Sequence, residues 1–204
     1  MCWNASVSIN TFLLGLFAMA LAVGNGVTQP RRCLFFLSFV SMQLVEAFLW
    51  RNLGRPAANR AGSVAGYALL ILQPLASLAS ARMDARTLAL SAGAYVALVA
   101  LALTAGRPWS SIDFSARRAA DGHLAWGWLD RLPVWILLPW LFFFVFRFAY
   151  EREWLSLALV VGSLALVYAT HARSGTWGSL WCWLANAVSI FLIAKVFYKD
   201  LCLR

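Results

Sequence analysis

Glu46 is the residue of this 204-residue chain whose type and position point most directly to chemistry. It lies within the apolar stretch 33–51, about five residues from the end of that stretch, which is roughly 8 Å deep at 1.5 Å per helical residue. A carboxyl group at that depth in a bilayer must be paired or neutral, and such groups often serve binding or proton transfer. Gln43, Glu46 and Trp50 follow the i, i+3, i+7 spacing of one helix face.

A second polar face lies close to the C-terminal end. Ser179, Cys182, Asn186 and Ser189 are separated by three, four and three residues, so a helix would present them together. We expect a polar binding site built from both faces and from residues near the same membrane surface. Its predicted members are Asn4, Gln43, Glu46, Trp50, His123, Trp126, Cys182, Trp183 and Asn186.

The composition indicates which elements carry these residues. Hydrophobic residues make up 62% of the chain and charged residues 12%, whereas soluble proteins average roughly 45–50% and about 25%. The mean hydropathy is +0.73. These values exclude an ordinary soluble enzyme and a disordered chain, and they predict an all-α polytopic membrane protein in a lipid bilayer. The net charge of +9 does not indicate nucleic-acid binding, because the basic residues separate the apolar stretches instead of clustering.

The chain contains seven apolar stretches near the roughly 20 residues that a membrane span requires. The predicted spans are 5–27, 33–51, 61–80, 86–106, 133–150, 153–171 and 178–198. They form a single seven-helix domain over 1–204, with the two termini on opposite faces because seven is odd. The basic residues divide almost evenly between the faces. The uncharged N-terminal tail and the basic C-terminal end favour an N-terminus outside and a cytoplasmic C-terminus.

Tryptophan is concentrated on the N-terminal face. Nine of the eleven tryptophans map there: Trp3, Trp50, Trp109, Trp126, Trp128, Trp135, Trp177, Trp181 and Trp183. One interpretation is an interfacial aromatic belt, although belts usually form at both interfaces. The other is an aromatic wall around a pocket that opens to the N-terminal face. Such a pocket, with amides and one carboxyl, suits a small polar or cationic solute or ion.

The third span carries a polar face of its own. Pro74 removes a helix hydrogen bond in mid-span and predicts a kink. Gln73 precedes it, and Ser77 and Ser80 continue the same face towards the opposite membrane surface. The pattern leaves room for a polar pathway through Gln73, Pro74 and Ser77. Arg147 and Lys195 near that surface are expected to extend their charged ends to water.

Other functions stay open at this stage. Only two histidines are present, which disfavours a three-histidine zinc hydrolase, and Lys195 lies too near the end of its span for a retinal protein. Cys182 and His123 could form a nucleophile pair in an intramembrane enzyme acting on a lipid-like substrate. A structural subunit of a membrane assembly, or a homo-oligomer, is also compatible with the composition. No motif specifies a metal or a cofactor.

Several short motifs carry a resemblance to a known family. They are Cys2-Trp3-Asn4 with Ser8, Thr11 and Phe12; Ser41-Met42-Gln43-Leu44 with Glu46 and Trp50; Gln73-Pro74; Gly122-His123-Leu124 with Trp126; and Gly175-Thr176 leading to Gly178-Ser179 and Trp181-Cys182-Trp183 with Asn186. In these motifs the chain resembles an uncharacterised family of short seven-helix membrane proteins from large DNA viruses, single-celled eukaryotes and bacteria. The resemblance implies the seven-helix fold and brings no assigned activity.

Overall fold

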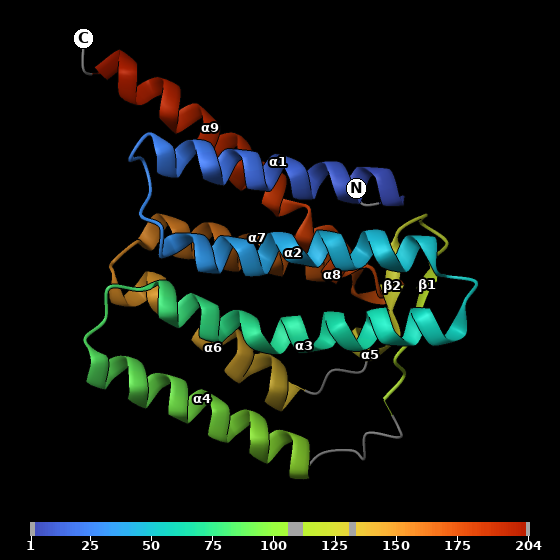
Figure 1. Ribbon diagram of the computed structural model, residues 1–204. Helices are drawn as coiled ribbons and strands as arrows, with labels where there is room; N and C mark the ends of the chain where they lie inside the picture. Colours follow the sequence, from blue (N-terminus) through green and yellow to red (C-terminus); the bar gives the residue numbers. More distant parts are fainter. Residues whose placement is uncertain (1–2, 106–111, 131–133, 203–204) are drawn as a thin grey trace.

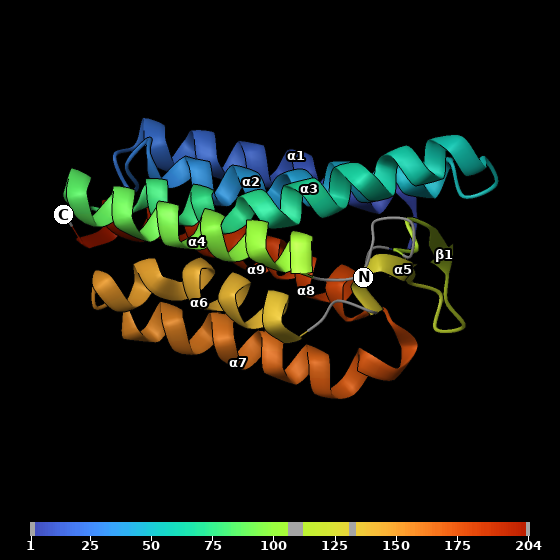
Figure 2. The same cartoon turned by 90° about the horizontal axis from the view of Figure 1, so that it is seen from below.

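The computed structural model describes residues 3–105, 112–130 and 134–202. Its long helices are α1 (Ala5–Gly24), α2 (Arg32–Arg51), α3 (Pro56–Ser80), α4 (Ala85–Ala105), α6 (Val134–Tyr150), α7 (Trp154–His171) and α9 (Leu184–Cys202). The short elements are β1 (Ala116–Arg118), β2 (Leu124–Trp126), α5 (Gly127–Asp130), the 3-10 helix η2 (Ala172–Ser174) and α8 (Trp177–Cys182). The long helices run roughly along one axis, and α1 begins at the end of the bundle opposite to the end where α9 finishes (Figures 1 and 2). We call these the N-terminal end and the C-terminal end.

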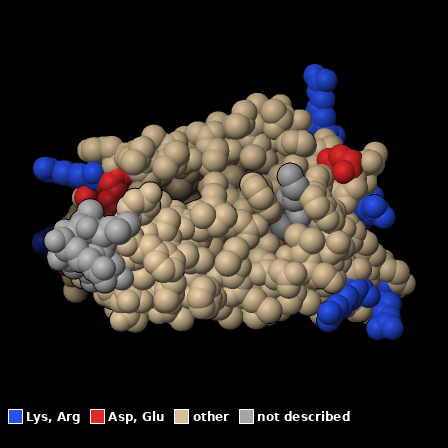
Figure 3. All heavy atoms as spheres, turned by 90° about the horizontal axis from the view of Figure 1, so that it is seen from above, with Lys and Arg blue, Asp and Glu red and all other residues tan. Residues whose placement is uncertain are grey.

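Six of the described helical segments are long and apolar enough to cross a bilayer, by length and composition. With 17 residues, α6 is shorter, so the structure does not confirm the seventh predicted span. Only 6% of the apolar window of α4 is buried inside the protein, and the same share holds for α7. Apolar helices with so little protein cover require lipid around them. Figure 3 shows the matching surface, with charged residues at the two ends and an uncharged band between them.

Close packing of α1 against its neighbours depends on small residues. The buried positions of α1 are Ser8, Thr11, Gly15, Ala18 and Ala22. A Cβ atom on Gly15 would lie 2.8 Å from both Val40 methyl carbons of α2, so only glycine fits there. Small residues of this kind let membrane helices approach closely, which compensates for the lack of a hydrophobic driving force in lipid.

The expected proline site in α3 is stabilised by two neighbouring helices. Pro74 has no N–H to donate to the carbonyl of Leu70, four residues earlier. The indole Nε1 of Trp140 on α6 donates to that carbonyl at 2.8 Å. One residue further along α3, the Ile71 carbonyl accepts from the hydroxyl of Tyr95 on α4 at 2.7 Å. The carbonyl that the proline leaves without a helical partner therefore holds α6 onto α3, and the neighbouring Ile71 carbonyl holds α4.

The connection 107–132 contains a small structure that the sequence analysis missed. β1 and β2 pair as an antiparallel hairpin, with Arg117 opposite Ala125. Gly122 in its turn has φ = 83°, which glycine adopts without strain. The side-chain amide of Asn59 on α3 hydrogen-bonds to β1 as the backbone of a neighbouring strand would. Its Nδ2 donates to the Ala116 carbonyl and its Oδ1 accepts from the Ala116 N–H, both at 2.8 Å. The hairpin is thus held against the first turns of α3.

The last predicted span, 178–198, is divided in the structure. α8 ends at Cys182 and α9 starts at Leu184, and α9 then leans away along α1 (Figure 1). The two parts have different partners. Trp181 packs against Phe39 of α2 and Trp140 of α6, whereas Asn186 donates to the Thr11 hydroxyl of α1 at 3.2 Å. The break at Trp183 allows both sets of contacts.

Candidate functional site

A small cavity lies where α2, α3, α6 and α8 meet β2 and α5. Its volume is about 20 Å³, which is room for roughly one water molecule. The wall is mostly aromatic and aliphatic and consists of Phe39, Met42, Leu70, Gln73, Trp126, Leu129, Trp140, Trp177, Gly178, Trp181 and Cys182. Three of the predicted site residues, Gln73, Trp126 and Cys182, are therefore brought together here.

Buried polar atoms without hydrogen-bond partners lie around this cavity. Among the described residues, Gln73 Oε1 and Trp126 Nε1 are two of them, and both residues line the cavity. Trp128 Nε1 in α5 and Ser179 Oγ in α8 are also buried without a hydrogen-bond partner among the described residues. Leaving a buried polar group unsatisfied costs about 1–3 kcal/mol, so a small guest that accepts or donates hydrogen bonds would be stabilised here.

Comparisons with known proteins give no relative for this arrangement. No family model, curated protein or solved structure matches the chain. The arguments about function therefore depend on the chain's own residues.

The predicted polar face of α2 is inside the protein. Gln43 and Glu46 both have 0% exposed surface. Phe39, on the same helix face and seven residues before Glu46, packs edge-on against Trp181 of α8. Glu46 thus lies on the side of α2 that α8 covers, one turn nearer to the N-terminal end than Met42 in the cavity wall. The carboxyl group of Glu46 is therefore inside the bundle rather than on its lipid surface, and its part in binding stays a prediction.

A buried polar column leads from the cavity to the C-terminal end along α3. It begins at Gln73, whose Nε2 donates to the Ser38 carbonyl of α2 at 3.4 Å. Ser77 follows and donates to the Phe144 carbonyl of α6 at 2.7 Å. Ser80 comes next and accepts from Nη1 of Arg147 at 3.1 Å. All three α3 side chains are buried, so the column Gln73–Ser77–Ser80–Arg147 lies inside the half of the bundle between the cavity and the C-terminal end.

The column ends in a charge cluster made of Arg32, Arg147, Glu151 and Glu153. Arg147 lies 3.0 Å from Glu153 and 3.7 Å from Glu151, and Arg32 lies 2.8 Å from Glu153 and 3.1 Å from Glu151. The guanidinium of Arg147 also lies over the rings of Phe148 and Phe35, at 4.7 and 5.5 Å. Arg147 is only 5% exposed, so the expectation that it extends to water is wrong. Two positive and two negative charges balance at this end instead, with Arg147 and Glu151 buried and with Arg32 and Glu153 partly exposed.

A different contact closes the N-terminal end. The Thr176 hydroxyl, just before α8, donates to Asp121 in the hairpin turn at 2.8 Å, and Ser174 Oγ lies 2.6 Å from Thr176 Oγ1. We call Asp121, Ser174 and Thr176 the hydroxyl pin. It joins the two elements, the hairpin and α8, that carry Trp126 and Trp181 over the cavity.

Two groups of this end have shifted pKa values. Burial alone would raise the pKa of Asp121, but the His123 N–H, the Thr176 hydroxyl and the charge of His123 stabilise the carboxylate and lower it. Burial lowers the pKa of His123, and the attraction of Asp121 offsets only part of this. The structure therefore favours an ionised Asp121 beside a neutral His123.

The remaining predicted residues lie in various places. Asn4 is exposed and caps α1 by accepting from the Val7 N–H at 2.9 Å, and Trp183 is exposed at the break before α9. His123 lies in the hairpin, with its ring 6.2 Å from that of Trp3. Pro74 and Ser77 are buried, and Trp50 is half-buried. A shared contact shell of Glu46, Cys182 and Asn186 stays a prediction.

The tryptophans of the N-terminal face divide into two groups. Trp126, Trp128, Trp177 and Trp181 are buried in the core, while Trp3, Trp135 and Trp183 are exposed. Trp109 lies outside the described residues. The buried group is part of an internal aromatic wall, and the exposed group has the position of an interfacial belt.

Metal binding has no support in the described part of the chain, where no group of three His, Cys, Asp or Glu side chains could hold an ion. Sequence reasoning missed Asn59, Trp140, the hydroxyl pin and the charge cluster. Only the cluster left a trace in the sequence, since Arg147 and Glu151 have the i, i+4 spacing of a helical ion pair.

Proposed function

We propose that this chain is a seven-span membrane protein that binds a small polar or cationic solute or ion at its N-terminal end and passes it towards the C-terminal end. The seventh span is α6, whose 17 residues include Pro139 and which packs against α3 along its length. Membership of the uncharacterised seven-helix family, and an N-terminus outside the cell, belong to the same proposal. The burial of Gln43, Glu46 and Gln73, which lie in the family motifs, supports it.

The observation that carries the proposal is the burial of polar side chains on two neighbouring helices. Gln43 and Glu46 are buried on α2, Gln73, Ser77 and Ser80 are buried on α3, and Ser80 accepts a hydrogen bond from Arg147. Buried polar and ionisable groups in membrane helices are costly, so their number on these two helices favours a pathway over isolated packing contacts.

The size of the cavity limits what this conformation holds. About 20 Å³ admits a guest of the size of water, ammonia or a bare monovalent cation. A larger solute would need the helices to separate. The proposal therefore favours the smallest solutes, including the proton, which side chains and single waters can relay.

Flux into liposomes tests this function. The purified chain is reconstituted and assayed for protons, ammonium, potassium and water, each driven by its own gradient. We expect flux of at least one of these species above that of empty liposomes and its loss in Gln73→Leu, because leucine removes the amide oxygen and nitrogen of Gln73 from the cavity wall.

The matched control is Gln29→Leu, in the exposed connection between α1 and α2, which should keep the wild-type flux. Absence of flux for all four species, or equal flux in Gln73→Leu and wild type, would overturn the proposal.

A further inference from the structure

Helix α8 is a short buried segment between two interruptions of the helical chain. Gly175, just before it, has φ = 69°, which glycine adopts without strain, and α9 starts as a separate helix after Trp183. All residues of α8 except Leu180 are buried. Residues at the ends of an element can absorb the backbone rotations of a hinge, so α8 can change its tilt while α7 and α9 stay in place.

The first turn of α8 closes the cavity wall against α5. Trp177 and Gly178 of this turn line the cavity, and Leu129 of α5 lines it beside them. Gly178 lies so close to Leu129 that a Cβ atom on the glycine would overlap the leucine side chain. This contact closes the boundary between α5 and α8, and a small tilt of α8 would open it.

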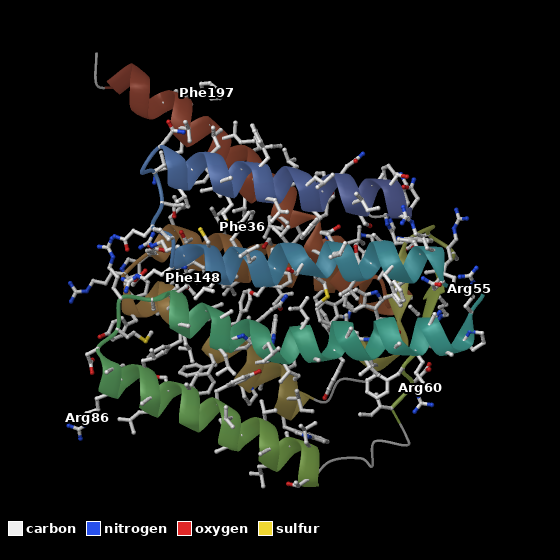
Figure 4. The ribbon with its side chains drawn as sticks, in the orientation of Figure 1. Phe36, Arg55, Arg60, Arg86, Phe148 and Phe197 are labelled. Carbon is white, nitrogen blue, oxygen red and sulfur yellow. The ribbon has the colours of Figure 1, made fainter. Side chains whose placement is uncertain are left out.

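The hydroxyl pin holds this closure in place. Thr176, the residue before α8, has 0% exposed surface and donates to Asp121 at 2.8 Å, whereas Asp121 itself is exposed in the hairpin turn. Figure 4 shows Arg55 and Arg60 pointing away from the bundle at the same end. Because the carboxylate is exposed, water can replace the Thr176 hydroxyl as its partner at a small net cost. The hydrogen bond is therefore suited to break and form again.

The second turn of α8 is fixed by three neighbouring helices. The ring of Trp181 packs edge-on against Phe39 of α2 at 5.1 Å and against Trp140 of α6 at 5.9 Å between centroids. Its indole N–H donates to Ser163 of α7 at 3.3 Å. A movement of α8 should therefore pivot near Trp181 and displace the first turn most.

We propose that α8 is a gate of the cavity. When the hydrogen bond from Thr176 to Asp121 breaks, the first turn of α8 moves away from Leu129 and opens the cavity towards the N-terminal end. The gate rests on the proposed function, because a cavity for about one water molecule admits a solute only when its wall moves. Its opening is nevertheless measurable without any flux.

Thiol labelling of Cys182 tests the gate. Cys182 is 5% exposed and lines the cavity, so a reagent reaches it when the wall opens. The background chain has serine in place of Cys2, Cys33 and Cys202; it is reconstituted in liposomes and treated with methyl methanethiosulfonate, and mass spectrometry gives the labelling rate. We expect slow labelling in this background. In Thr176→Val it should be about tenfold faster, because valine keeps the branched shape and loses the hydrogen bond to the carboxylate.

Three further variants separate the gate from a general loss of structure. Asp121→Ala removes the same hydrogen bond from the hairpin side and should accelerate labelling to a similar extent. Thr176→Ser keeps the hydroxyl and should label slowly. Thr170→Val is the matched control, because the Thr170 hydroxyl donates to the Leu166 and Val167 carbonyls within α7, and it should also label slowly. Hydrogen exchange at the turn between α6 and α7 should be the same in all of them.

The labelling and flux experiments can fail separately. Labelling at the background rate in Thr176→Val, or equally accelerated labelling in Thr170→Val, would overturn the gate. Accelerated labelling in Thr176→Val without flux of any tested species would uphold the gate and overturn the proposed function. Flux in the wild type with no acceleration of labelling in Thr176→Val would overturn the gate alone.

Discussion

The two ends of the bundle are closed by different chemistry. At the C-terminal end, two arginines and two glutamates form ion pairs between α2 and the junction of α6 and α7, with Arg147 buried against aromatic rings. At the N-terminal end, the hairpin and the start of α8 meet through hydroxyl groups and one carboxylate, and Trp126 of the hairpin packs against Trp128 of α5. One end therefore depends on buried charge, and the other on hydrogen bonds and on the position of a short strand. The two ends should respond to different perturbations.

The largest effect is expected from Arg147→Met at the C-terminal end. The change leaves the buried carboxylate of Glu151 and that of Glu153 without one of their two positive partners, and breaking a buried pair costs about 3–5 kcal/mol. Thermal unfolding in detergent measures the loss. Addition of Glu153→Gln to Arg147→Met should restore part of the stability, because it removes one of the excess negative charges. A loss below about 1 kcal/mol, typical of exposed pairs, would show that the cluster is not buried in the membrane-embedded protein.

The middle of the bundle should be next in sensitivity. Trp140→Phe removes the donor to the Leu70 carbonyl, which Pro74 leaves without its helical partner, and we expect a loss of about 1–3 kcal/mol. In a Pro74→Ala background the helix supplies its own N–H, so the same change should cost less by about 1 kcal/mol. The double-mutant cycle measures this difference. Equal costs in the two backgrounds would mean that the indole does not serve the proline site.

A smaller and local effect is expected from Asn59→Ala at the N-terminal end. Loss of two neutral hydrogen bonds to Ala116 should weaken the hairpin by about 1–2 kcal/mol. Hydrogen exchange should then become faster at residues 116–118 and stay unchanged beside the charge cluster. Asn52→Ala is the control, because the Asn52 side chain donates to the Phe48 carbonyl within its own helix end and makes no other hydrogen bond to the described residues. Faster exchange at both ends would contradict the independence of the two closures.

The smallest effect is expected from mild acid, which should lower the stability of the hairpin at the N-terminal end. The folded protein lowers the pKa of His123, so the unfolded hairpin gains a proton first as the pH falls through about 6.5. Hairpin stability should be full above that pH and decrease towards about pH 5, where the ordinary carboxylates stay ionised. Hydrogen exchange of residues 116–126 between these two pH values measures the decrease. His123→Gln should abolish it, and a wild type without any change would contradict the assignment.

The sequence predicted the helices well and the contacts between them poorly. Boundaries of the apolar stretches follow from composition, so α2 and α7 agree with the predicted 33–51 and 153–171 within one residue. The burial of Glu46, and the buried face of Gln73 and Ser77, also follow from position on a helix. The hairpin was missed because its third partner, Asn59, is 57 residues distant from Ala116 in the chain. The same holds for Trp140, whose function depends on a proline of another helix.

Arg147 at the C-terminal end also shows that contacts between distant helices could not be predicted from the sequence. Arg147 was interpreted from its place near a span terminus, which predicts exposure, whereas its burial depends on Phe35 and Arg32 from a helix more than 100 residues earlier. The binding residues around Glu46 stay a prediction for a similar reason. Depth along each helix can be counted from the sequence, but the rotation of one helix against another depends on packing.

The pH dependence of flux in Glu46→Gln tests the central claim most directly. The account assigns passage of a small cation to the buried polar groups of α2 and α3, which include this carboxyl, and glutamine keeps its shape but neither its charge nor its proton. Flux into liposomes should be lost in Glu46→Gln while the melting temperature stays close to that of the wild type, and Asp84→Asn, at an exposed carboxyl, should behave as the wild type. Full flux in Glu46→Gln with an unchanged pH profile would contradict the account.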